Sequence, residues 1–170
     1  MSRPIMFSRV FPSYHPKKGE PTLFVEKIWK SLAGTNCEWD LQNFMVVTKL
    51  LELQLPIMHH APKHHTIRAG HRWKIGDNFS PRVWSGIPYR SKQIIIAPDI
   101  EIKKIWDIKI VGFNIYINKV QLIGHSTHEP YVELANNDGL LINDFWDWFD
   151  QKYAEPFDGQ IICWNESVNY

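Results

Sequence analysis

Cysteine is scarce in this chain of 170 residues, which has only Cys37 and Cys163. Two thiols are too few for a disulfide framework, and they lack the close spacing of zinc ligands, so we expect both to be buried. Long apolar runs are also missing: none approaches the ~18 residues of a membrane-spanning helix. The start MSRPIMFSR has too short an apolar run for a signal peptide. The sequence therefore predicts a cytoplasmic protein with no membrane segment.

Net charge is also small, at only +1, which argues against a protein bound to nucleic acid along its whole surface. The charges are nevertheless unevenly distributed. Seven cations lie between His59 and Gln93 against the single acid Asp77, namely Lys63, Arg68, Arg72, Lys74, Arg82, Arg90 and Lys92. After Thr127 the balance reverses, with nine acids against Lys152. This asymmetry predicts one basic side that could receive phosphates, and the alternative is two ordinary solvated faces.

The length fits one domain spanning residues 1–170, and the aliphatic and aromatic content is enough to fill a core. Hydrophobic periodicity predicts a strand at 5–10, a helix from Pro21 that stops at Gly34, a helix at 40–55, strands at 79–84, 93–96, 100–110 and 115–123, a helix around 145–153 and a strand at 161–164. In the strand at 100–110 the alternation slips at Lys103 and Lys104, which indicates a bulge. This order favours strands wrapped into a barrel, with helices packed on its outside.

The segment PKHHTIR at 62–68 carries the most informative side chains. If residues 64–68 form a strand after a turn at Pro62, Thr66 and Arg68 share one face, and Lys63 can join them from the preceding loop. An amine, a hydroxyl and a guanidinium together suit an anion site or a reactive site, with Lys63 as a base and Arg68 holding a phosphate or carbonyl. The alternative is that both cations are solvated and Thr66 is an ordinary strand residue.

In these motifs the chain resembles the ASCH branch of the PUA-like superfamily. ASCH domains carry a K-x-x-T-I-R segment and then a W-x-x-G-D turn into a barrel strand, which residues 63–68 and 73–77 match in order. Further matches are an opening strand at 5–11, an acidic residue before glycine at 138–139 and a closing strand at 159–164. The resemblance implies an α+β fold, a PUA-like (ASCH-type) β-barrel with flanking helices. It fails between Phe11 and Pro62, which implies a helical insertion at about residues 12–62.

The resemblance also implies a catalytic group. In ASCH-like acetylcytidine amidohydrolases the K-x-x-T segment supplies a lysine and a threonine, and a later glutamate completes the site. The matching residues here are Lys63, Thr66 and Asp138. Lys63 would be the base for Thr66 or for a water, Asp138 the proton donor to the leaving amine, and Arg68 the residue that orients the substrate. The chain departs from the family in that aspartate is one methylene shorter than glutamate. The alternative is that Asp138 and Gly139 simply form a turn.

Aromatic and basic side chains around the motif extend the expected ligand site. Trp73, Trp84 and Tyr89 lie among the cations, a pattern that stacking on nucleobases requires, although tryptophans at this spacing also build cores. The residues expected to bind the ligand are Arg68, His65, Trp73, Arg72, Trp84 and Arg90.

Histidines are crowded in the same region, at positions 59, 60, 64, 65 and 71, with His125 and His128 further along. They lack a regular ligand spacing on defined elements, so we expect a solvent-facing loop, no metal and no cofactor. One imidazole can still line the cleft, where it would bind phosphate or relay a proton.

Two classes of function remain open. The first, which we favour, is an ASCH-type module that binds RNA or a nucleoside in a cleft lined by Lys63, Thr66 and Arg68. The alternative is a small amidohydrolase that cleaves an acyl group from an acylated cytidine-like nucleoside. Convergence of Lys63, Thr66 and Asp138 around one concave pocket favours the enzyme, whereas a pocket open to a long basic groove favours RNA.

Overall fold

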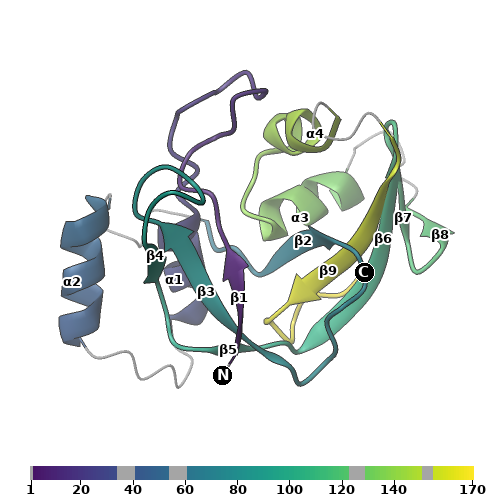
Figure 1. The fold of residues 1–170 in the computed structure, drawn as a ribbon. Coiled ribbons are helices and arrows are strands. Elements are labelled where there is room, and N and C mark those ends of the chain that lie inside the picture. The colour runs from purple at the N-terminus through teal and green to yellow at the C-terminus, as the bar shows by residue number, and fades with distance from the viewer. Residues whose placement is uncertain (1, 34–40, 54–60, 123–128, 151–154) are drawn as a thin grey trace.

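The computed structural model describes residues 2–33, 41–53, 61–122, 129–150 and 155–170. These residues form nine strands in two sheets and four helices, so the fold is α+β. Figure 1 shows the two sheets beside each other, with two helices at one end of the five-stranded sheet and one helix standing at the outer side of the four-stranded sheet. Among the described residues, no helix is long and apolar enough to cross a membrane.

The four-stranded sheet contains β1 (Arg3–Met6), β3 (Asn78–Trp84), β4 (Gln93–Ile95) and β5 (Ile100–Glu101). β3 is its centre: β1 pairs with β3 in parallel, and β4 and β5 pair with β3 antiparallel. Alternate side chains of β3, Phe79 and Val83, are fully buried, which fixes the face that this sheet turns toward the core.

The five-stranded sheet has the order β2 (His65–Ala69), β9 (Phe157–Cys163), β6 (Lys104–Val111), β7 (Asn114–Ile117) and β8 (Val120–Gln121), and every pair is antiparallel. Asn118 and Lys119 join β7 to β8 with positive φ angles of 49° and 70°, the backbone that a two-residue hairpin turn requires. The sequence predicted a single strand at 115–123, and this turn divides it.

The predicted bulge at Lys103 and Lys104 is wrong. β5 ends at Glu101 in one sheet and β6 begins at Lys104 in the other, so the chain changes sheets there. The Ile102 N–H donates to Asp77 O at 2.8 Å, and the Lys103 N–H donates to Cys163 O at 2.8 Å. The two consecutive residues thus bond to different sheets. The alternation of apolar and polar residues slips at this point because the chain passes from one sheet to the other.

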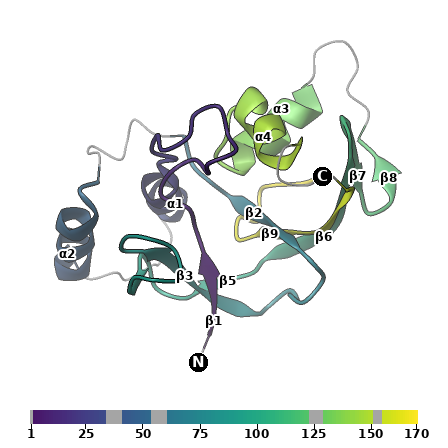
Figure 2. The same cartoon turned by 45° about the horizontal axis from the view of Figure 1, so that its top comes forward.

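No strand pairing joins the two sheets within the part of the chain that the structure describes, so these strands do not form a closed barrel. β1 and β2 are the facing edges. They are linked through a side chain, because Arg68 Nη2 on β2 donates to Met6 O on β1 at 2.6 Å. Figure 2 shows the sheets from a second direction, with β1 beside β3 in one sheet and β2 beside β9 in the other.

The helices are α1 (Phe24–Leu32), α2 (Leu41–Leu51), α3 (Glu129–Asn137) and α4 (Ile142–Asp150). The predicted apolar stripe of α1 is confirmed, with Phe24, Ile28 and Trp29 all buried. α1 begins at Phe24 and not at Pro21. Just before it, the Thr22 hydroxyl donates to Ser8 O at 2.6 Å. The helix signals at Gly34, Asp40 and Pro56 lie outside the described residues.

α1 lies inside the segment that the sequence assigned to an insertion, yet it is part of the central structure. The Trp29 indole donates to Ile96 O at 2.5 Å, and Trp164 Nε1 donates to Ser31 Oγ at 3.0 Å. α1 is therefore bonded to the residue that follows β4 of one sheet and to the residue that follows β9 of the other. Cys163 is fully buried as predicted, whereas Cys37 lies outside the described residues.

Candidate functional site

β2 presents the motif residues much as strand alternation predicts. Thr66 and Arg68 both line one cavity, and Lys63 joins them from the segment just before the strand. The backbone of this segment is fixed on both sides: the Lys63 N–H donates to Lys27 O on α1 at 3.0 Å, and the His64 N–H donates to Asn137 O at the end of α3 at 2.8 Å. Lys63 is therefore held where the two helices meet β2.

Asp138 reaches the same place from the end of α3. The Gly139 N–H donates to Asn136 O and the Leu140 N–H to Ala135 O, both at 2.9 Å, and Gly139 has φ +78°. This is the paired bonding of a Schellman cap, which needs glycine at the left-handed position. A Cβ at Gly139 would also lie 3.2 Å from Lys63 Cβ. Asp138 and Gly139 thus form a turn, and that turn carries the carboxylate to Lys63.

Lys63 and Asp138 form a buried ion pair. Lys63 Nζ donates to Asp138 Oδ1 at 2.6 Å and also to the Asp138 backbone carbonyl. Lys63 is 1% exposed and Asp138 is 6% exposed. The Phe24 ring lies 4.4 Å from the amine, and Lys27 Nζ donates to Gly139 O at 2.6 Å beside the pair. An aliphatic and aromatic wall therefore surrounds two groups that are usually solvated.

Burial moves both pKa values toward each other. Desolvation, opposed by the Asp138 carboxylate and assisted by the nearby charge of Arg68, lowers the pKa of Lys63 to about 8. Desolvation also raises the pKa of Asp138, against the opposing charge of Lys63. Both shifts favour the uncharged forms, so a proton passes between these two groups more easily than between a solvated lysine and a solvated aspartate.

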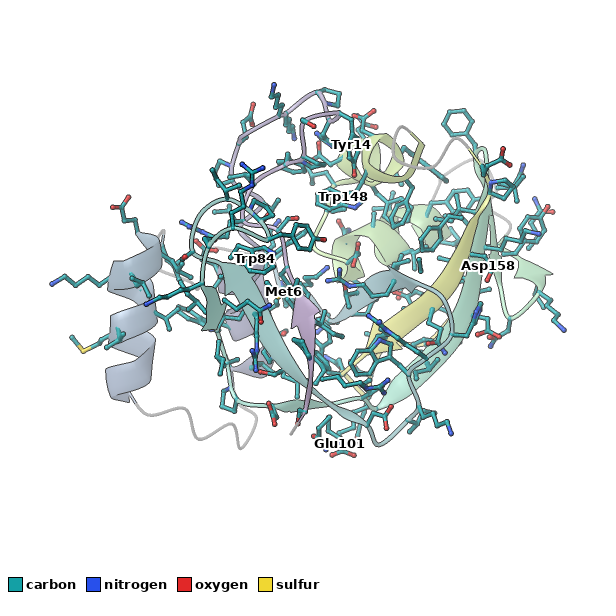
Figure 3. The ribbon with its side chains drawn as sticks, viewed as in Figure 1. Met6, Tyr14, Trp84, Glu101, Trp148 and Asp158 are labelled. Atoms are coloured by element: carbon teal, nitrogen blue, oxygen red, sulfur yellow. The ribbon has the colours of Figure 1, made fainter. Side chains whose placement is uncertain are left out.

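The cavity has a volume of about 300 Å³, which is at the small end of the range for small-molecule sites. Its polar lining comes from Lys63, Thr66, Arg68, Arg72 and Asp138, with Ser8. Its apolar lining includes Phe7, Phe24, Trp148 and Phe149. Met6 and Trp148, which line it from β1 and α4, are labelled near the centre of Figure 3. The site is thus built where the edges of the two sheets approach and the helices cover them.

His65 and Tyr170 lie beside the Lys63–Asp138 pair and bond to each other. Asn137 Nδ2 donates to the Tyr170 hydroxyl at 2.9 Å, so the tyrosine proton is donated onward to His65 Nε2 at 2.8 Å. A neutral His65 then carries its proton on Nδ1, which lies 3.7 Å from Asp138 Oδ1, beyond hydrogen-bond distance. Complete burial and the charge of Lys63 hold the pKa of His65 well below its usual value, so the ring is neutral. Sequence reasoning named His65, but no pattern pointed to Tyr170, 105 positions away.

Three other expected ligand residues lie outside the cavity lining. Trp73 is buried in the core, 6.3 Å from the Phe79 ring, which corrects its expected role because a core indole cannot stack on a ligand. Trp84 packs on the exposed Tyr89 with ring centroids 5.4 Å apart, and Arg90 is exposed in the same loop. Arg72 does line the cavity and is itself exposed.

The described histidines of this region, at positions 64, 65 and 71, do not share one solvent-facing loop, as the sequence suggested that they would. His65 is fully buried on β2, and His64 is half-buried and bonded to Asn165. His71 is exposed, 3.3 Å from Asp158. Positions 59, 60, 125 and 128 lie outside the described residues. Among the residues that are described, no three His, Cys, Asp or Glu side chains are grouped as metal ligands would be.

A second cavity, of about 530 Å³, lies on the exposed side of the five-stranded sheet. Its ionisable lining residues are His71, Asp107, Lys109, Lys119 and Asp158. Figure 3 shows Asp158 toward the edge of the molecule. These side chains are solvated, and none of them belongs to the predicted site. The smaller cavity holds the buried and perturbed groups, and we therefore take it as the functional site.

Comparison of the chain with protein-family models, with curated proteins and with solved structures gave no match. The function must therefore be argued from the geometry of the site.

Proposed function

We propose that the cavity is the active site of a small amidohydrolase that removes the acyl group from the amino nitrogen of an acylated, cytidine-like nucleoside. One observation carries the proposal: the buried Lys63 amine, with its pKa lowered to about 8, lies 2.6 Å from Asp138 in the wall of a cavity that Thr66 also lines. The three groups converge on one concave pocket, and this arrangement favours the hydrolase over the binding module that the sequence alone favoured.

The chemistry needs one proton to move from the nucleophile to the leaving nitrogen. The neutral Lys63 amine takes the proton of the Thr66 hydroxyl, or of a water, as oxygen attacks the acyl carbon. Lys63 is in direct contact with Asp138, so this proton can pass to the carboxylate. Asp138 then donates it to the nitrogen as the carbon–nitrogen bond breaks. If Thr66 attacks, water cleaves the resulting ester, which releases the carboxylic acid and restores the hydroxyl.

The rest of the cavity suits a nucleobase with a short acyl group. Phe7, Phe24 and Trp148 offer apolar contacts to a flat ring, and the Arg68 guanidinium, 5.2 Å from the Phe7 ring, offers donors to its carbonyl oxygen. A volume of about 300 Å³ has room for a pyrimidine base with a short acyl group.

The same proposal extends to the fold. We propose that the two sheets are an open form of the PUA-like barrel of ASCH domains, enlarged by the helical segment at about 12–62. The order of the motif segments supports this proposal: residues 63–68 enter β2, the Gly76–Asp77 turn precedes β3, and the closing strand β9 pairs with β2. α1 then supplies Phe24 and Lys27 to the site, so the added segment is part of the active centre.

The test is incubation of the pure protein with acetylcytidine, with acetylated adenosine and guanosine as comparisons, followed by chromatography of the products. We expect release of cytidine and acetate, and no release with Lys63→Ala or Thr66→Ala. Lys109→Ala is the matched control, because Lys109 lies on the exposed face of β6 away from this cavity. Wild-type protein that leaves every acylated nucleoside intact would refute the proposal.

Binding of single-stranded RNA is a second candidate, favoured by one observation. Tyr89 is 90% exposed, packs against Trp84, and is followed by the exposed cations Arg90 and Lys92. An exposed aromatic pair beside cations is a stacking platform for bases. Filter binding across a salt series tests it. Affinity should fall as salt rises and should weaken in Tyr89→Ala, and the absence of either effect would count against RNA.

A further inference from the structure

Two lysine amines bond to consecutive backbone carbonyls at the end of α3. Lys63 Nζ donates to the Asp138 carbonyl, and Lys27 Nζ donates to the Gly139 carbonyl at 2.6 Å. The carbonyls at the C-terminus of a helix form the negative end of its dipole, so cations are favoured there. Lys63 comes from the coil before β2 and Lys27 comes from α1. Two distant segments of the chain therefore cap the same helix end.

Gly139 is packed between the stems of these two lysines. A Cβ at this position would lie 3.2 Å from Lys63 Cβ, and 3.4 Å from both Lys63 Cδ and Lys27 Cδ. Any side chain at position 139 would therefore press on both stems. Because glycine leaves this space free, both lysines pack against the turn that carries Asp138.

Lys27 also holds Lys63 through the backbone. The Lys63 N–H donates to Lys27 O at 3.0 Å, while the Lys27 amine holds the peptide that follows Asp138. One residue of α1 is thus bonded on both sides of the buried pair, in which Lys63 Nζ lies 2.6 Å from Asp138 Oδ1. Lys27 is not among the described residues of the cavity lining, so it acts on the pair and not on a ligand.

We infer that Lys27 is the positioning residue of this site, which holds the Lys63 amine against the Asp138 carboxylate and favours the uncharged form of that amine. Its part in catalysis rests on the proposed function, whereas its effect on Lys63 rests on the contacts themselves. A positive charge beside a second amine makes protonation of that amine less favourable. Lys27 therefore acts through Lys63, by geometry and by charge.

The charged groups around Lys63 agree with this role. Burial is the largest cause of the lowered pKa of Lys63, and the Asp138 carboxylate opposes it. The positive charges of Arg68 and Lys27 act in the same direction as burial. His65, which follows on β2, has a pKa well below its usual value and is neutral. Lys27 therefore contributes one of the two positive charges that favour the free amine.

The surroundings of Lys27 favour its own charged form. Burial lowers the pKa of Lys27, but the carboxylates of Asp144 on α4, Glu26 on α1 and Asp138 all oppose this effect. Lys17, which bonds to Asp144 Oδ2 at 2.8 Å, is the one cation that acts with burial among the causes of the shift. The two buried lysines thus differ in their neighbours, because three carboxylates act on Lys27 and one acts on Lys63.

Titration of Lys63 in variants of Lys27 tests the inference without any need for turnover. Lys27→Met removes the amine and keeps a flexible, unbranched stem that can pack against Gly139. Lys27→Gln removes the same charge and keeps a polar end, as a second variant should the first fail to fold. By NMR of labelled lysine, the Lys63 amine should titrate about one pH unit higher in both variants, because the lost charge and the loosened turn both favour its protonated form. Lys109→Met, on the outer face of β6, should leave the Lys63 titration unchanged.

The pH dependence of hydrolysis provides the second measurement. In Lys27→Met the rise of kcat/KM should move to higher pH by the same amount, which lowers the rate at pH 7 about tenfold. A Lys63 titration that stays at its wild-type pH in the Lys27 variants would overturn the inference, and a lowered melting temperature beside it would show that Lys27 only stabilises the fold. A titration that moves, in a protein that cleaves no acylated nucleoside, would uphold the effect of Lys27 on the pair and refute only the proposed reaction.

Discussion

Lys63 Nζ lies 2.6 Å from Asp138 Oδ1, although 75 positions separate the two residues in the chain. The contact is made by two local structures, the coil that enters β2 and the Schellman cap of α3, which meet through the His64 to Asn137 backbone hydrogen bond. Breaking a buried pair by removing one partner typically costs about 3–5 kcal/mol, so a site of this kind is retained only where the rest of the fold is stable enough to hold it.

The rate of hydrolysis should rise with pH. Only the uncharged amine can accept a proton, and the pKa of Lys63 is lowered to about 8. Below pH 8 the rate should therefore fall about tenfold per pH unit, and above pH 8 it should level off. Measurement of kcat/KM between pH 5.5 and 9.5 tests this rise and the plateau above it. A rate that is constant from pH 6 to pH 9 would exclude Lys63 as the base.

Both conservative substitutions of Asp138, to asparagine and to glutamate, should lower the rate of turnover. Asp138→Asn keeps the shape but cannot pass a proton, so turnover should drop by ~100-fold or more. Asp138→Glu lengthens the side chain by one methylene, yet Asp138 already reaches Lys63 and is 6% exposed. The extra methylene must displace the carboxylate or the amine, and misplacement by about 1 Å costs ~100-fold.

Steady-state kinetics of both Asp138 variants, with thermal denaturation to check folding, provides the measurement. If Asp138→Glu is faster than wild type, the carboxylate acts from a position that the longer side chain reaches better, and the geometry described for the pair is not the reactive one.

Hydrolysis should require the hydroxyl group of Thr66. If it is the nucleophile, Thr66→Ala should lower kcat by ~10⁶-fold, as the loss of an activated nucleophile does in other hydrolases. Thr66→Ser keeps the hydroxyl and should retain measurable activity. A loss of only about tenfold in Thr66→Ala would show that water attacks directly and that Thr66 merely orients it. Mass spectrometry of protein quenched during turnover would detect the acyl ester that only the nucleophile forms.

Tyr170→Phe should destabilise the protein by about 1–3 kcal/mol, because it leaves His65 Nε2 and Asn137 Nδ2 without their shared partner in a buried site. The melting temperature should fall by about 2–4 °C for each kcal/mol. Tyr116→Phe, on the outer face of β7, is the control and should change it little. Equal changes of melting temperature in the two variants would show that the contact between His65 and Tyr170 contributes no more to stability than an exposed tyrosine hydroxyl does.

The local parts of the site follow from the sequence, because they depend on strand alternation and on short motifs. Thr66 and Arg68 are two residues apart on β2 and so share a face, and the Asp138–Gly139 pair forms the turn that its composition favours. The order of most strands and the apolar face of α1 follow from periodicity in the same way.

Long-range contacts could not be read from the sequence. Nothing in a one-dimensional pattern shows that Ile102 and Lys103 bond to different sheets, and the slip in alternation was therefore interpreted as a bulge. The burial of Trp73 beneath Arg3, and the meeting of Tyr170 with His65, depend on segments about 70 and 105 positions apart. The membership of the ASCH family and the cytoplasmic location stay predictions.

Titration of the Lys63 amine in the folded protein tests the central claim most directly. With ¹³C- and ¹⁵N-labelled lysine, the Lys63 resonance is assigned as the one that disappears in Lys63→Ala, and its shift is followed from pH 6 to pH 11. A Lys63 pKa near 8 is the expected result, and it should be lower still in Asp138→Asn, because the Asp138 carboxylate raises this pKa against the effect of burial. A Lys63 pKa of 10 or above would contradict the account, because an amine that stays charged near neutral pH cannot act as the base.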